Sequence, residues 1–111
     1  MKPNKQKLDC NIMINDIGSW SSGNFQLRAD STYTLIITYP FSKPANFKIK
    51  VGKRGMDFIG LMPHIKKCYI KKYESAEIDD DDGYWHGIED LALEGAYVDH
   101  KKKEITLDIG S

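Results

Sequence analysis

Hydrophobic and polar residues alternate along most of the chain, the period-two pattern of half-buried β-strands. The pattern predicts strands over residues 8–14, 25–27, 33–39, 47–51, 92–98 and 104–109. Stretches containing Gly, Ser or Pro separate several of these segments and mark loops or turns. Residues 99–103 join the last two strands and predict a hairpin.

One segment follows a different period. From Asp57 the apolar residues recur every three or four positions, which indicates a helix with one apolar face. This stripe consists of Phe58, Leu61, Met62, Ile65, Cys68, Tyr69 and Tyr73. We expect Pro63 either to delay the start of the helix or to kink it. We also expect the helix to end near Glu77, because the carboxylates that follow are unfavourable beside a helix C-terminus.

The predicted elements follow the order ββββαββ and indicate an α+β fold. Because each apolar face needs a partner, we expect a single antiparallel sheet of about six strands with the amphipathic helix packed on one face. A chain of 111 residues suits one core, so residues 1–111 are expected to form a single domain.

The sequence also bears on where the chain resides. It contains neither an apolar run long enough to span a membrane nor the apolar core of a signal peptide near its start. Its two cysteines do not form a CxxC motif. We therefore expect a cytoplasmic protein with reduced thiols.

The net charge of zero conceals two opposite blocks. Residues 42–73 contain nine Lys or Arg and one Asp, whereas residues 74–99 contain ten Asp or Glu and neither Lys nor Arg. Segregation on this scale creates local potentials that steer charged partners, even though the whole chain is neutral.

The acidic block runs directly into aromatic residues held between glycines. We call it the acidic-aromatic segment; its candidate partner-binding residues are Asp79, Asp80, Asp81, Asp82, Tyr84, Trp85, His86, Glu89 and Asp90. Trp and Tyr dominate binding hot spots, and surrounding charge speeds encounter with an oppositely charged partner. Four successive Asp residues repel one another and do not help the helix that they follow, which favours binding over capping of the core by the aromatic residues.

These features predict a small non-catalytic binding protein that docks a basic protein partner. Small proteins with such a segment are of the kind that mask the active sites of toxins or nucleases, so by analogy the concrete form of this hypothesis is an immunity protein or a phage-type inhibitor. Neither a cofactor nor a metal ion is expected.

The basic block supports an alternative, a nucleic-acid-binding module. We call its candidate residues the basic set: Lys48, Lys50, Lys53, Arg54, Lys66, Lys67, Lys71 and Lys72. A contiguous positive surface would attract phosphates. Against this, Arg is scarce and no RNA-binding aromatic motif is present. Lysines that keep the sheet soluble are the simpler explanation, and self-association between basic and acidic blocks is a third alternative.

Three further patterns carry weaker chemical signals. His86 and His100, beside Asp90 and Asp99, could serve as the acid and base of a small enzyme. His64 and Cys68 share one helical face, but no motif supplies a third group, so both Cys68 and Cys10 are predicted to be structural thiols. Residues 78–89 resemble a calcium loop but place Ile78, which has no ligand oxygen, at the first ligand position.

Overall fold

A computed structural model describes residues 5–16, 26–39, 44–75 and 90–110. The strands are β1 (Lys5–Met13), β2 (Gln26–Leu27), β3 (Thr32–Ile37), β4 (Ala45–Lys50), β5 (Met56–Asp57), β6 (Ala92–Asp99) and β7 (Glu104–Gly110). A 3-10 turn, η1 (Ile14–Asp16), follows β1, and the α-helix of the described residues, α1 (Phe58–Ser75), follows β5. The α+β class and the helix are therefore confirmed.

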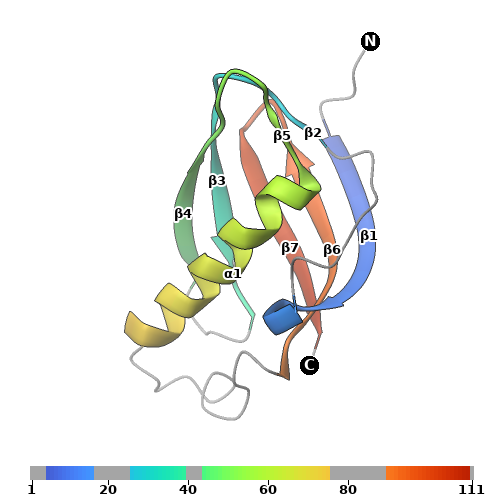
Figure 1. The fold of residues 1–111 in the computed structure, drawn as a ribbon, viewed down its shortest axis with the longest axis vertical. Coiled ribbons are helices and arrows are strands. Elements are labelled where there is room, and N and C mark those ends of the chain that lie inside the picture. Colours follow the sequence, from blue (N-terminus) through green and yellow to red (C-terminus); the bar gives the residue numbers. More distant parts are fainter. Residues whose placement is uncertain (1–4, 17–25, 40–43, 76–89, 111) are drawn as a thin grey trace.

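The predicted sheet is wrong in its pairing. The main sheet has five strands in the order β1-β6-β7-β3-β4, and β3 runs parallel to β7. The segment predicted as a second strand instead forms a separate two-stranded sheet, β2 with β5. Alternation of residue types shows which face of a strand is buried but not which strand lies beside it. The β6–β7 hairpin, which was predicted, lies between β1 and β3, and this insertion creates the parallel pair (Figure 1).

Helix α1 lies across one face of the main sheet (Figure 1). Its predicted apolar stripe is confirmed, because every member from Phe58 to Tyr69 is buried and Tyr73 is partly buried against the same core. From the sheet, alternate residues such as Leu35, Val98 and Ile105 complete this core. The Tyr69 hydroxyl also donates a hydrogen bond to the Tyr39 carbonyl oxygen at 2.9 Å, which ties the helix to the chain just after β3.

The start of α1 is defined by a side-chain cap. The Asp57 carboxylate accepts a hydrogen bond from the Gly60 backbone N–H at 2.8 Å, satisfying one of the donors that a helix leaves unpaired in its first turn. Pro63 lies within the helix, five residues after its first residue, so it does not delay the start. The described helix ends at Ser75, and the predicted end at Glu77 lies outside the described residues.

The turn before β5 depends on one glycine. Gly55 has a φ of +73°, and a Cβ built at this position would lie 2.8 Å from the Leu27 carbonyl oxygen of β2. Both the left-handed backbone and this close approach require glycine. Among the described residues, no helix is apolar enough over a sufficient length to cross a membrane.

The N-terminal cap of α1 gives a direct test of how the helix begins. Asp57→Ala is expected to lower the free energy of unfolding by about 1 kcal/mol, because the Gly60 N–H loses its side-chain partner. Asp57→Ser keeps a capping oxygen, so its free energy of unfolding should fall much less. Urea denaturation of the three proteins measures this difference, and equal losses for Ala and Ser would show that the cap does not stabilise the helix.

Candidate functional site

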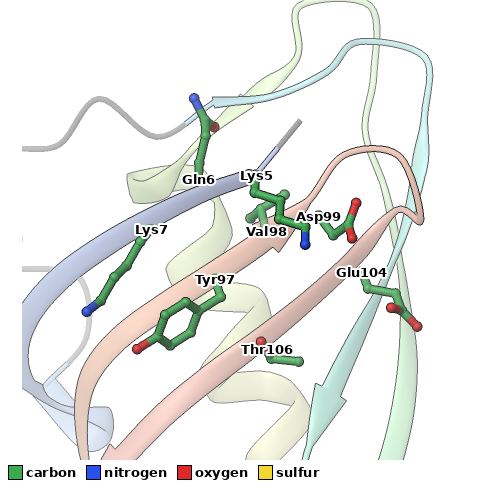
Figure 2. A pocket seen from close by; sticks show the side chains of 8 residues that line it. All are labelled: Lys5, Gln6, Lys7, Tyr97, Val98, Asp99, Glu104 and Thr106. Atoms are coloured by element: carbon green, nitrogen blue, oxygen red, sulfur yellow. The ribbon is translucent and has the colours of Figure 1, made fainter. Parts of the chain in front are cut away.

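The face of the main sheet opposite α1 contains a shallow cavity with a volume of about 280 Å³. Figure 2 shows the side chains that line it, from β1, β6 and β7. Strand register brings them together: Lys5 lies opposite Asp99, which lies opposite Glu104, and Lys7 lies opposite Tyr97, which lies opposite Thr106. We call the face of the main sheet opposite α1, which contains this cavity, the open face.

The open face combines both charges with one aromatic ring. The Lys7 ammonium lies 5.4 Å from the centre of the Tyr97 ring and 3.4 Å from an Asp9 carboxylate oxygen. The hydrogen bond and the charge of Asp9 raise the pKa of Lys7. Tyr97 keeps 39% of its surface exposed. Such a surface can hold a polar group against an aromatic ring, with lysines and carboxylates available on either side.

Asp99 also has a local structural role. Its carboxylate accepts hydrogen bonds from the backbone N–H groups of Lys101 and Lys102 at 3.0 and 3.1 Å, which holds the β6–β7 turn. These hydrogen bonds lower the pKa of Asp99. The carboxylate is therefore an ionised acceptor that fixes the turn beside the cavity.

His100 follows Asp99 in this turn but is buried, with 3% of its surface exposed. The Tyr33 hydroxyl lies 2.7 Å from Nδ1 of His100, and Nε2 lies 3.0 Å from the Gln6 side-chain oxygen. The backbone N–H of Arg28 donates to the Tyr33 oxygen at 3.1 Å. The hydroxyl can thus donate its own proton to Nδ1 while Nε2–H donates to Gln6, which assigns the neutral tautomer.

The surroundings of His100 favour this neutral form. Burial lowers its pKa, and the positive charges of Arg28 and Lys103 lower it further, while Asp99 acts in the opposite direction. Because both ring nitrogens are engaged inside the protein, His100 could act on a substrate only if this network opened. Its companion in the predicted enzyme site, His86, lies outside the described residues.

The predicted burial is confirmed for the Cys68 thiol and only in part for the Cys10 thiol. Cys68 is buried on α1, and Cys10 is half-buried on β1, where its thiol donates to the Leu93 carbonyl oxygen at 3.4 Å. Burial raises the pKa of both thiols, that of Cys10 to about 11. Both are protonated near neutral pH and are poor nucleophiles.

The basic set is divided between the two faces of the molecule. Lys48 and Lys50 lie in register with Thr34 and Thr32, on the open-face side of β4, and the Lys48 ammonium donates to the Thr34 hydroxyl at 2.8 Å. The α1 lysines lie on the opposite side. Among them, Lys66 donates to the Asn15 carbonyl oxygen at 3.0 Å. The two groups meet at a groove of about 230 Å³ between β4 and α1, lined by Phe47, Lys48, Ile49, His64, Lys67, Cys68 and Lys71.

Most of the acidic-aromatic segment lies outside the described residues. Its last member, Asp90, is described and exposed immediately before Leu91 and β6. The candidate calcium loop over residues 78–89 also falls outside the described part. Within the described residues, no three His, Cys, Asp or Glu side chains are grouped closely enough to hold a metal ion.

Comparisons with protein-family models, curated proteins and solved structures found no match to this chain. Its function must therefore be inferred from its own residues.

Sequence reasoning missed the open face, although part of it follows from the predicted hairpin. Once residues 92–98 and 104–109 are paired, Tyr97 and Thr106 fall on the same side of the sheet. The contribution of Lys5 and Lys7 needs the pairing of β1 with β6, which joins segments far apart in the sequence. No residue pattern in the chain indicates that pairing.

The His100 network predicts a pH-dependent stability. Folding lowers the pKa of His100, so the unfolded chain binds its proton more readily and acid favours unfolding. The free energy of unfolding should decline as pH falls from about 7.5 toward about 5. At the higher pH, the free energy of unfolding of His100→Gln should be about 1–3 kcal/mol below that of the wild type. It should then decline less than that of the wild type as the pH falls.

His64→Gln is the matched control, because it makes the same substitution at an exposed position outside the His100 network. Denaturant unfolding at a series of pH values measures all three proteins. A wild-type decline that His100→Gln leaves unchanged would exclude His100 as its source.

The burial of the thiols predicts slow modification. In the folded protein at about pH 7.5, a thiol-reactive chromogenic reagent should label Cys68 and Cys10 many-fold more slowly than in denaturant, because both thiols are protonated and shielded. Cys68→Ser and Cys10→Ser variants assign each rate. Labelling of either cysteine as fast in the folded as in the unfolded chain would contradict this assignment.

Proposed function

We propose that the protein is a small non-catalytic binding protein that docks a basic protein partner through the acidic-aromatic segment. The proposed type is an inhibitor or immunity protein, with a toxin or nuclease as the class of partner. The supporting observation is the run Asp79–Asp82 followed by Tyr84 and Trp85, within a block of ten acidic residues that contains neither Lys nor Arg.

The position of this run argues for a role outside folding. It begins four residues after the described end of α1 at Ser75. The C-terminal end of a helix carries partial negative charge, so nearby carboxylates do not stabilise it. Four adjacent carboxylates also repel one another. A basic partner would offset both costs and gain a fast, electrostatically steered encounter.

The chemistry of the described residues is compatible with a binding role. His100 is hydrogen-bonded on both ring nitrogens, and the pKa values of both thiols are raised. The described core is closed by apolar packing, and none of its buried polar side chains lacks a hydrogen-bond partner. These observations support a stable scaffold that presents a binding segment.

The deciding variant combines Asp79–Asp82→Ser with Trp85→Ala. The wild-type protein, immobilised and exposed to lysate of its own host, should retain a basic protein whose binding weakens with salt. The purified partner should then bind the variant about ten- to thirty-fold more weakly, since it loses both the steering charge and an aromatic anchor.

A matched control removes four exposed acidic charges elsewhere, with Asp9→Asn, Glu74→Gln, Glu94→Gln and Asp108→Asn. This control should bind nearly as tightly as the wild type if the location of the charge matters. Equal affinity of the wild type and the Asp79–Asp82/Trp85 variant for the recovered partner would disprove the proposed interface.

A further inference from the structure

The groove between β4 and α1 is lined by basic side chains, opposite in sign to the charge of the acidic-aromatic segment. In the order β1-β6-β7-β3-β4, β4 pairs with β3 on one side and with no described strand on the other. Figure 1 shows it at the margin of the sheet, with α1 crossing nearby. Phe47, Ile49 and Cys68 provide an apolar lining for the groove, while Lys67, Lys71 and His64 supply basic side chains from α1.

The strand register identifies which backbone groups face this edge. The Val51 N–H donates to the Ser31 carbonyl oxygen at 2.8 Å, continuing the antiparallel β3–β4 register. Because hydrogen-bonded pairs alternate in an antiparallel ladder, Phe47 and Ile49 also direct their N–H and C=O groups toward β3. Asn46, Lys48 and Lys50 direct theirs outward, where they can pair with an added strand.

Charge flanks this edge on both sides of the sheet. Lys48 and Lys50 lie on the open-face side, and Lys67 and Lys71 lie on the α1 side. Neither Lys67 nor Lys71 has an ion-pair partner among the described residues, whereas Lys7 at the opposite edge of the sheet pairs with Asp9. A strand added to β4 would direct alternate side chains to the two sides, so carboxylates on either face would meet lysine.

We propose that β4 binds an extended acidic peptide segment of another protein by strand addition, with the peptide lying along the β4–α1 groove. Backbone hydrogen bonds to Asn46, Lys48 and Lys50 set its register. Lys67 and Lys71 attract its carboxylates, and the apolar lining receives an intervening aliphatic side chain. This site shares no residue with the acidic-aromatic segment, so it is independent of the proposed function.

Nucleic acid fits this groove less well. The lysines are split between two sides of a strand edge instead of following one phosphate track, and no arginine is among the lining residues. Phe47 is the one Phe, Tyr or Trp among the described residues that line the groove, and it is partly buried against the core, whereas single-stranded nucleic acid is bound by stacking successive bases on several aromatic rings. Backbone groups that pair with no described strand, by contrast, are the complement that a peptide strand needs.

The test uses a fluorescent acidic peptide, Ac-Glu-Val-Asp-Glu-Leu-Asp-Glu-amide, titrated with the full chain at about 50 mM salt, where screening is weak. The peptide should bind, and a Gln/Asn version should bind at least about ten-fold more weakly. N-methylation of alternate backbone nitrogens should weaken binding similarly, because it removes the donors that pair with the edge. Alternate N-methylation gives two peptides, one for each set of backbone nitrogens. If both bound as tightly as the unmodified peptide, strand addition would be excluded.

Matched double variants locate the site. Lys67→Gln with Lys71→Gln should weaken peptide binding about ten-fold, while Lys101→Gln with Lys102→Gln, which removes two exposed lysines from the β6–β7 turn, should change it little. Equal losses in both variants would indicate attraction to charge alone and would overturn the proposal.

Two other occupants give distinct results. A nucleic-acid site would be identified if a thymidine decamer bound the wild-type protein more tightly than the peptide does and bound the Lys67/Lys71 variant more weakly than the wild type. Light scattering that detects a dimer without peptide, lost in that same variant, would assign the edge to a second copy of this chain. Either result would overturn the proposal.

Discussion

The packing of the apolar face of α1 on one side of the main sheet is the interaction on which the rest of the structure depends. It buries the stripe from Phe58 to Tyr69 against residues such as Leu35, Val98 and Ile105. Burial on this scale is the main favourable term in folding a small domain. It also determines which surfaces remain for binding, because the side chains on the opposite face of each strand then meet solvent.

Two consequences follow from this one-sided packing. The open face presents polar side chains to solvent, and Tyr97 is exposed among Lys7, Asp9 and Thr106. The same packing brings Lys67 and Lys71 of α1 beside the edge of β4 that pairs with no described strand, where they line a groove together with Lys48. Basic side chains of α1 and β4 therefore gather at this groove, whereas the open face carries both lysines and carboxylates.

Local patterns in the sequence predicted the local structure well. The three- and four-residue spacing from Asp57 identified α1 and its buried side chains, and the alternation around residues 99–103 identified the β6–β7 hairpin. The parallel pairing of Leu35 with Ile105 was not predictable, because residue alternation is the same whichever neighbour a strand has. The burial of His100 depends on Gln6 and Tyr33, two residues from distant segments, and its sequence context resembles an ordinary exposed turn.

Strand addition at β4 requires that the outward backbone groups of this edge, which pair with no described strand, are free to bind in the isolated protein. Amide hydrogen exchange measured residue by residue by NMR tests it most directly. In the isolated protein, the amides of Phe47 and Ile49 should exchange slowly, and those of Asn46, Lys48 and Lys50 should exchange quickly. The acidic peptide should then slow exchange at Asn46, Lys48 and Lys50. Uniformly slow exchange along β4 in the isolated protein, or no change on adding the peptide, would contradict strand addition at this edge.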